Sequence, residues 1–206
     1  MKIKVDNIGR RFNRDWIFRR LDFSFLAGER YAVLGPNGSG KSTFLKVLSG
    51  YLTPSEGEIL VDHSGQSLKI EEVATRFSVS APYIELIEEF TLEEHIHFHF
   101  KFKSYIEGYD FDRVNEILGL QHSLHKTIRF FSSGMKQRVK LILACFSQSD
   151  VLILDEPTSN LDQKGVEWFH NLLDLTAGSR IVVIGSNQED EYKSCRHFIN
   201  LPDFQS

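Results

Sequence analysis

One glycine-rich stretch constrains this chain more than any other feature. Residues 35–42 read GPNGSGKS and match the pattern G-x-x-x-x-G-K-[ST], with a β-rich apolar run at 31–34 before it and a helical pattern at 44–48 after it. Glycines allow backbone N–H groups to converge on an anion without clashes from Cβ atoms. The N-terminus of the following helix adds the positive end of its dipole. The stretch therefore predicts a strand, a phosphate-binding loop and a helix, in that order.

The polar residues of this loop have separate predicted roles. Lys41 is expected to reach the β- and γ-phosphates of a nucleotide, and the hydroxyl of Ser42 is expected to bind Mg²⁺. The remaining candidate nucleotide-binding residues of the loop are Gly35, Asn37, Gly38, Ser39, Gly40 and Thr43. The alternative, a glycine-rich turn without a ligand, is disfavoured because the strand and helix signals flank the motif in the required order.

Two adjacent carboxylates end the most apolar run of the chain. Residues 151–154 read VLIL, which is typical of a strand buried on both faces of a sheet, and Asp155 and Glu156 follow directly. Strand alternation turns the two side chains to different sides. Asp155 is predicted to bind Mg²⁺, and Glu156 to orient and polarise a water molecule as a general base. A solvated strand end is the competing interpretation, and the phosphate loop makes it the weaker one.

The remaining pattern divides the chain into an α/β core and a helical segment. Apolar β-rich runs are expected to form strands at 3–8, 21–26, 31–34, 58–61, 73–79, 181–184 and about 197–201. From about residue 91 to 146 the periodicity is helical instead. We therefore predict a single domain, 1–206, with a nucleotide-binding core at 1–79 and 151–206 and a helical subdomain at 80–150.

Composition excludes some classes of function. The formal net charge of -4 and the pI of about 6.1 argue against a general nucleic-acid binder, so no nucleic-acid partner is expected. Cys145 and Cys195 lie in or beside apolar segments, which indicates reduced thiols and a cytosolic location. The opening residues, MKIKVDNIG, do not resemble a signal peptide. Apolar runs such as 141–146 are too short to span a membrane, so a membrane role is expected to need a partner protein.

Further segments complete an ordered set of motifs. Residues 131–138 read FSSGMKQR and lie between the phosphate loop and the acidic strand end, and residues 159–162 read SNLD. With them, nearly the whole chain resembles the ATP-binding cassette (ABC) ATPases: the first segment is similar to the family's signature motif and the second to its D-loop. Phe12 stands where the family has an aromatic residue that stacks on adenine. The resemblance implies an α/β P-loop NTPase fold, with an ABC-type ATPase core, an antiparallel β edge and a helical subdomain.

The resemblance also implies a mechanism that needs two cassettes, identical or different. They would pair head to tail, with each ATP held between the phosphate loop of one cassette and Ser132, Ser133 and Gly134 of the other, at a helix N-terminus suited to anions. Asp162 would belong to the D-loop. ATP hydrolysis with Mg²⁺ would release the pair and drive a separate transmembrane permease subunit. The expected location is cytoplasmic and peripheral, on the inner face of the cell membrane.

The sequence departs from the family pattern at three places. The signature reads FSSGM where the family has LSGGQ, but Gly134 allows close backbone approach, so ATP sandwiching is expected to survive. Ser80 takes the place of the Q-loop glutamine, and its shorter side chain would reach Mg²⁺ through water at best. Within residues 183–190, VIGSNQED, Asn187 takes the place of the switch histidine and can donate a hydrogen bond but cannot carry a proton. Because Glu156 is present, we predict ATP hydrolysis that persists but is slow.

Two other functions compete with transport. A soluble ABC-type clamp acting on ribosomes or DNA is disfavoured, because such proteins usually look like two cassettes in one chain or carry coiled-coil or basic additions. A slow or non-hydrolysing module that dimerises on ATP is favoured by Ser80 and Asn187. A metal site at His95 and His99 lacks a nameable third ligand, so an amphipathic or partner-facing helix is preferred. Residues 83–90, YIELIEEF, fit either a contact surface for the membrane subunit or an ordinary surface loop.

Overall fold

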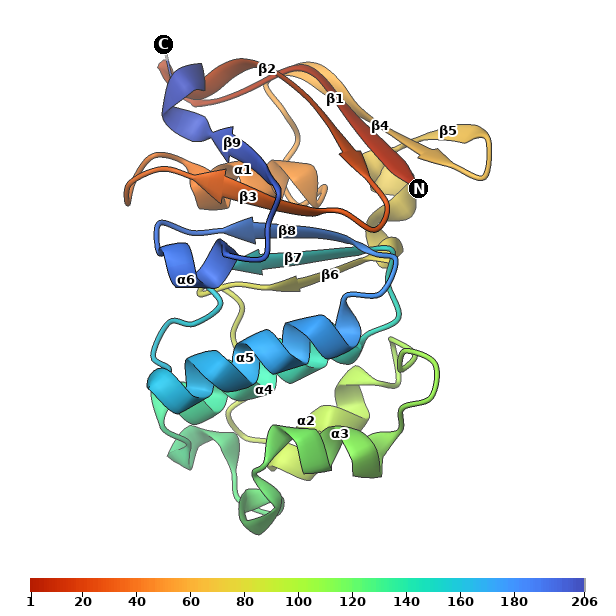
Figure 1. Cartoon of the computed structure of the whole chain (residues 1–206), viewed down its shortest axis with the longest axis vertical. Helices are drawn as coiled ribbons and strands as arrows, with labels where there is room; N and C mark the ends of the chain where they lie inside the picture. Colours follow the sequence, from red (N-terminus) through yellow and green to blue (C-terminus); the bar gives the residue numbers. More distant parts are fainter. Residues whose placement is uncertain (206) are drawn as a thin grey trace.

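The computed structural model of the chain describes residues 1–205 and contains two β-sheets stacked above a group of helices (Figure 1). One sheet is antiparallel, with the strand order β2 (Asp15–Leu26), β1 (Lys2–Phe12), β4 (Glu56–His63) and β5 (Gln66–Lys69). The other is parallel, with the order β6 (Phe77–Ser80), β7 (Val151–Asp155), β8 (Ile181–Gly185), β3 (Arg30–Leu34) and β9 (His197–Asn200). This mixed architecture confirms the predicted α/β fold class.

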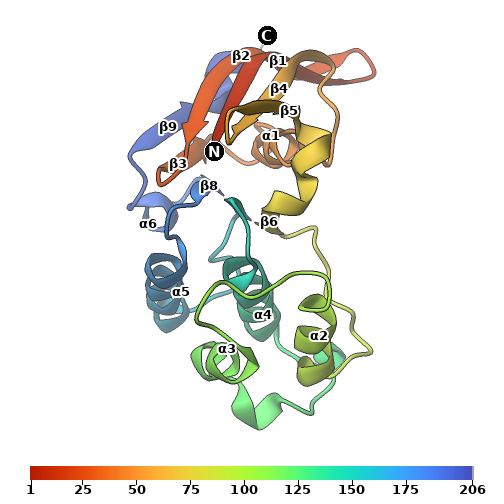
Figure 2. The ribbon, with the colours of Figure 1, turned by 90° about the vertical axis from the view of Figure 1, so that its right-hand side faces the viewer.

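Helices and turns connect the strands. α1 (Lys41–Leu48) follows β3, α5 (Gln163–Thr176) lies between β7 and β8, and the short α6 (Glu189–Tyr192) lies between β8 and β9. Between β6 and β7 lie α2 (Leu92–His99), α3 (Phe111–Leu118), α4 (Ser133–Phe146) and the 3₁₀ turns η2 (Gln121–Ser123) and η3 (Ile128–Phe130). Two further turns are η1 (Ile70–Arg76) and η4 (Leu201–Phe204). Figure 2 shows α2 and α3 at the end of the molecule opposite the antiparallel sheet, with α4 between them and the parallel sheet. Across residues 1–205, no helix is long and apolar enough to cross a membrane.

The parallel sheet is buried on both faces, because alternate side chains of its strands enter different cores. In β7, Val151 and Ile153 belong to the core shared with the antiparallel sheet and α1, whereas Leu152 and Leu154 belong to the core shared with α4 and α5. All residues of this strand are 0% exposed. Burial of each aliphatic side chain contributes about 1.5–3 kcal/mol. The carboxylate at the end of β7, Asp155, is therefore carried by one of the most firmly packed strands.

The structure corrects the strand predicted at 73–79. The chain forms the turn η1 up to Arg76, and β6 begins only at Phe77. Val73 is 1% exposed, so this apolar residue packs into the core from a turn rather than from a strand. The sequence also gave no indication of β5, whose residues, QSLK, lack an apolar alternation. The division into a core and a helical subdomain at residues 79 and 80 stays a prediction.

Candidate functional site

The phosphate loop connects β3 to α1 and is shaped by glycines with left-handed backbone angles. Gly35, Gly38 and Gly40 have φ angles of 148°, 82° and 97°. Gly40 precedes α1 as its N-cap, and a Cβ atom there would lie 2.3 Å from Cγ2 of Ile17. Both the backbone angle and the available space therefore require glycine at this position. The loop borders a cavity of about 230 Å³, whose lining comprises Ile17, Asn37, Gly38, Gly40, Lys41, Ser42, Thr43 and Glu156.

Lys41 is the cation of this cavity and is only 5% exposed. Its ammonium group donates hydrogen bonds to the backbone carbonyl oxygens of Gly35, at 2.8 Å, and Pro36, at 3.1 Å. None of the ion pairs in the described chain includes Lys41. The loop thus holds the ammonium group with neutral acceptors, which an anionic ligand can displace.

Asp155 supplies a buried carboxylate beside the same loop. Neither of its oxygens has a hydrogen-bonding partner of good geometry among the described residues. Burial raises the pKa of this carboxyl group, while the nearby hydroxyl of Ser42 and the ammonium groups of Lys41 and Lys46 act in the opposite direction. A buried carboxylate without a bound partner is costly, and Mg²⁺ prefers oxygen ligands. The side chains of Asp155 and Ser42 therefore fit a magnesium site.

Glu156 follows Asp155 and leaves the strand in a left-handed conformation, with a φ angle of 46°. Its N–H donates a hydrogen bond to the carbonyl oxygen of Gly185 at 2.9 Å, and its own carbonyl oxygen accepts one from the hydroxyl of Ser159 at 3.0 Å. A non-glycine residue in this conformation costs on the order of 1–3 kcal/mol, so the two contacts hold a strained turn. The turn presents the Glu156 side chain to the cavity, where a carboxylate can polarise water.

The loop after β8 also reaches the phosphate loop. Asn187 donates a hydrogen bond from Nδ2 to Oδ1 of Asn37 at 3.2 Å. Asn37 lines the cavity, so the Asn187 side chain lies at its border. A contact between Asn187 and a γ-phosphate stays a prediction. The neutral amide can donate a hydrogen bond there, but it cannot take up a proton.

Several residues predicted from the sequence are not part of the cavity lining, among them Ser80 and Phe12. Ser80, at the end of β6, is 1% exposed, and its hydroxyl has no hydrogen-bonding partner within the described chain. Phe12 is 43% exposed, with the Arg10 guanidinium 4.6 Å from its ring centroid. Ile17 lines the cavity instead, and the sequence analysis missed it. The alternation of β2 could have indicated it, because Phe18 enters the core and its neighbour must face the other side.

The signature residues lie outside the cavity and contact the D-loop. Ser132 is exposed and caps α4 by accepting a hydrogen bond from a backbone N–H of the first turn at 3.2 Å. Ser133 is also exposed. Gly134 approaches the D-loop so closely that a Cβ atom there would lie 2.8 Å from the backbone oxygen of Asn160. Asp162 caps α5 with a hydrogen bond of 2.8 Å. The signature and the D-loop of one chain are therefore packed together.

The histidines of α2 have structural partners. Nε2 of His95 accepts a hydrogen bond from the N–H of Ile87 at 3.0 Å, and Nε2 of His99 lies 2.8 Å from the hydroxyl of Ser147. Burial lowers the pKa of His99 to about 4, so its ring is neutral near physiological pH. The described part of the chain contains no cluster of three or more His, Cys, Asp or Glu side chains suited to a metal ion. His95 and His99 thus connect α2 to neighbouring segments.

The arrangement as a whole defines a class of protein. A strand, a glycine-rich loop and a helix surround a buried ammonium group. In the same sheet, β7 ends in a buried carboxylate whose oxygens have no hydrogen-bonding partner of good geometry within the described chain. These groups match the triphosphate and the Mg²⁺ that accompanies it. The chain is therefore a nucleoside-triphosphate-binding protein of the P-loop class.

Comparisons with known proteins identify the family. The sequence model of the family described as ABC transporter matches residues 18–159, so the chain belongs to the ABC transporter family, as an ATP-binding subunit. It is 29% identical over 198 residues to the uncharacterized ABC transporter ATP-binding protein YybJ of Bacillus subtilis, covering 94% of this chain and 89% of that protein. It is also 29% identical over 182 residues to the bacitracin transport ATP-binding protein BcrA of Bacillus licheniformis, covering 88% of this chain but only 60% of BcrA.

A solved structure supports the fold. The putative ABC transporter ATP-binding protein from Pyrococcus furiosus matches this chain with a TM-score of 0.84 at 22% identity, covering 100% of both chains. The likeness confirms the predicted P-loop ABC ATPase fold. The chain thus belongs to the ABC ATPase family, whose members generally hydrolyse ATP.

Proposed function

We propose that this chain is the ATP-hydrolysing subunit of an ABC transporter, in which two cassettes close head to tail around ATP and Mg²⁺ and drive separate membrane subunits from the cytoplasmic side. One observation carries the proposal. The cavity is bordered by Lys41, Ser42 and Glu156, whereas the signature residues 132–134 lie outside it, two of them exposed. A triphosphate bound in the cavity would remain exposed on one side. The N-terminus of α4 from a second cassette suits an anion and could cover that side.

Each polar group of the cavity has a task in this proposal. Lys41 exchanges its two carbonyl partners for phosphate oxygens, and Asp155 and Ser42 hold Mg²⁺, which neutralises phosphate charge when bound. Glu156 orients and polarises the attacking water. Asn187 donates a hydrogen bond at the γ-phosphate. Hydrolysis is slower than with a histidine at that position, because an amide is uncharged and does not take up or release a proton near neutral pH.

The remaining residues act at the margins of the site. Phe12 stacks on adenine beside Ile17, which belongs to the same β1–β2 hairpin. Ser80 contacts the Mg²⁺ shell through water from its buried position next to the end of β7. Asp162 fixes the start of α5, so that the D-loop meets the signature residues at the interface of the two cassettes.

Replacing Asn187 with histidine is expected to raise the rate of phosphate release by about tenfold or more, because an imidazole can hold charge and proton at the γ-phosphate. The rate is measured as phosphate release at saturating ATP and Mg²⁺. The control is Asn187→Gln, which keeps an amide and should give no rise. If histidine leaves the rate unchanged, Asn187 does not act on the γ-phosphate.

The contact with the membrane subunit is assigned to a groove of about 410 Å³ beside the predicted surface segment 83–90. Its lining comprises Pro82, Ile84, Glu85, Leu86, Glu88, Lys136 and Lys140. Lys136 pairs with Glu88, and Lys140 donates a hydrogen bond to the carbonyl oxygen of Ala81 at 3.3 Å. The groove thus joins the segment after β6 to α4, which begins at the signature. A cytoplasmic segment of the membrane subunit that binds in this groove can transmit movement through α4 to the ATP interface.

When this chain is purified from native membranes, a protein with several membrane spans is expected to co-purify with it. Ile84→Asp, in the groove, should reduce this co-purification about tenfold with ATP binding unchanged, because a charge would be buried in an apolar contact. The control is Leu175→Asp on α5, a leucine that is 49% exposed and outside the groove. Recovery of the chain with ribosomes alone would contradict the transport function and support the clamp.

A further inference from the structure

Glu191 is a buried carboxylate that none of the roles above uses. It lies on α6 and is 1% exposed. Its Oε1 atom accepts hydrogen bonds from the backbone N–H of Thr158 at 2.7 Å and from the hydroxyl of Thr158 at 2.5 Å. Its Oε2 atom accepts a hydrogen bond from the hydroxyl of Ser186. The ion pairs of residues 1–205 do not include Glu191, so these donors are what balances its burial.

The first partner, Thr158, belongs to the turn that carries Glu156. The hydroxyl and the N–H of Ser159 both bond back to the carbonyl oxygen of Glu156, at 3.0 and 3.1 Å. The same turn is held from α4, where buried Gln137 donates a hydrogen bond to the carbonyl oxygen of Pro157 at 2.8 Å. Glu191 thus fixes one end of the strained turn on which Glu156 depends.

The second partner, Ser186, belongs to the loop that carries Asn187. Its hydroxyl donates to Glu191 and accepts a hydrogen bond from the N–H of Gln188 at 2.9 Å. The residues on both sides of Asn187 are therefore tied down, and the Asn187 side chain is directed to Asn37 of the phosphate loop. One carboxylate consequently spans the two loops that bring Glu156 and Asn187 to the cavity.

From this geometry we infer that Glu191 is a positioning residue for ATP hydrolysis, which sets the separation of Glu156 and Asn187 so that both face one γ-phosphate. The inference rests on the proposed function, since it assigns both residues to the phosphate. In this role Glu191 also couples movement of the D-loop to the position of the Asn187 loop. The D-loop continues directly from the turn at Thr158, so a shift of the D-loop on dimer closure reaches the Asn187 loop through Glu191.

The chemistry of the three bonds predicts a graded response to substitution. All of them need an acceptor on residue 191, and a carboxylate supplies two acceptor oxygens. Glutamine supplies one, and its NH₂ group would face the Ser186 hydroxyl, which must then reverse its own hydrogen bond. Alanine supplies none and leaves the donors of Thr158 and Ser186 buried without partners. Glu191→Gln should therefore retain part of the tie, and Glu191→Ala none of it.

The kinetic test separates positioning from folding. Glu191→Ala is expected to lower kcat about tenfold to hundredfold with the KM for ATP changed less than about twofold, and Glu191→Gln to lower kcat less. The effect of Asn187→Ala on kcat should largely vanish in the Glu191→Ala background. The control is Thr176→Val, which removes a buried hydroxyl bonded to Leu172 at 2.7 Å and should reduce stability but leave kcat of the folded protein unchanged. Fully additive effects of Glu191→Ala and Asn187→Ala would overturn the inference.

Hydrogen exchange of the nucleotide-free protein tests the tie without hydrolysis. Glu191→Ala should speed amide exchange in both 156–160 and 186–188, with exchange in 39–43 unchanged. Unchanged exchange in either loop would overturn the inference, whatever the hydrolysis rate. If the wild type releases no phosphate but Glu191→Ala shows this exchange pattern, the proposed function is contradicted and the tie between the two loops is still established.

Discussion

Replacing Glu156 with glutamine is expected to lower the rate of phosphate release by about 100-fold or more, while ATP still binds. The carboxylate lines the cavity beside Lys41 and Ser42, and glutamine has nearly its shape without its basicity. Binding depends on the loop and on Lys41, which the substitution does not alter. Phosphate release at saturating ATP gives the rate, and titration with a fluorescent ATP analogue gives the affinity.

The same variant distinguishes the competing functions. With hydrolysis blocked, ATP and Mg²⁺ should trap a dimer that size-exclusion chromatography separates from the monomer, because the ATP that holds the two cassettes together is no longer hydrolysed. Glu189→Gln is the matched control, since this exposed carboxylate lies outside the cavity lining and should leave both measurements unchanged. Equal rates near background for the wild type and Glu156→Gln would refute hydrolysis. A dimer formed without phosphate release would favour the ATP-gated module.

The parts of the site that sequence could predict are those that local rules determine. The glycines of the phosphate loop have left-handed angles that few other residues adopt, so the motif carries its own conformation. The run before Asp155 is apolar at every position because both faces of β7 are buried, which marks it as a central strand without reference to distant residues. The parallel strands β3 and β7, with β8 between them, then bring the two motifs to the same end of the sheet.

The parts that were missed depend on which distant segments meet. Ile17 reaches the cavity because the β1–β2 hairpin folds over the phosphate loop, where Gly40 leaves room for its methyl group. Glu191 ends the acidic run Glu189, Asp190, Glu191, and nothing in that run distinguishes it from its exposed neighbours. Its burial comes from the position of α6 against the turn after β7. The hydrophobic periodicity of the sequence cannot reveal such a contact, because so short a helix shows no repeating pattern.

Replacing Asp155 with asparagine is expected to change activity and stability in opposite directions. Loss of the Mg²⁺ ligand should lower phosphate release by about 100-fold or more. Without nucleotide and Mg²⁺, however, the variant should be more stable by about 1–2 kcal/mol, because a neutral amide replaces a buried carboxylate whose oxygens lack partners within the described chain. Denaturant unfolding with and without Mg²⁺ and ATP measures the stability.

The pH dependence gives the sign of this effect. Burial raises the pKa of Asp155, so the folded state binds the proton more tightly than the unfolded state does. At a pH below the ordinary carboxyl value of 3.8 both states are protonated and the carboxyl group costs the fold nothing. The penalty grows as the pH rises from 3.8 toward the raised pKa and is complete above it. The stability advantage of the asparagine variant should therefore grow from acid toward neutral pH.

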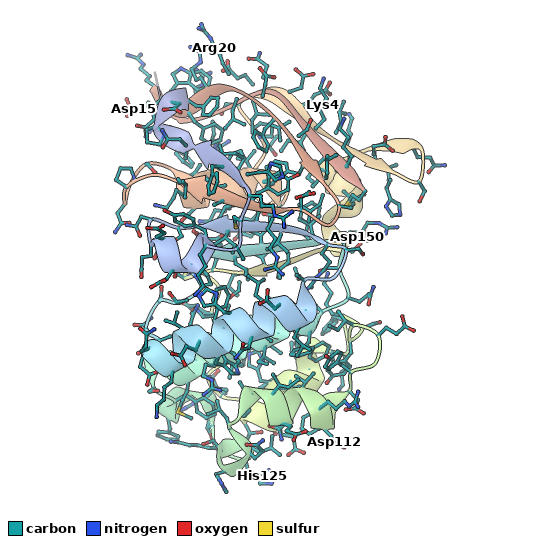
Figure 3. The ribbon with its side chains drawn as sticks, viewed as in Figure 1. Lys4, Asp15, Arg20, Asp112, His125 and Asp150 are labelled. Carbon is teal, nitrogen blue, oxygen red and sulfur yellow. The ribbon has the colours of Figure 1, made fainter. Side chains whose placement is uncertain are left out.

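The control for the charge change is Asp150→Asn. Asp150 directly precedes β7 at its other end (Figure 3), is partly exposed and pairs with Arg76 at 2.9 Å. Loss of an exposed ion pair should cost less than about 1 kcal/mol and show no gain toward neutral pH. Ligands that bind only the folded state shift unfolding, so Mg²⁺ with ATP should stabilise the wild type and the control. The Asp155 variant should gain less, because it has lost a Mg²⁺ ligand while the loop and Lys41 still bind ATP. An Asp155→Asn protein that is less stable than the wild type without Mg²⁺ would mean that the carboxylate already has a partner, and the assignment of its free oxygens to Mg²⁺ would fail.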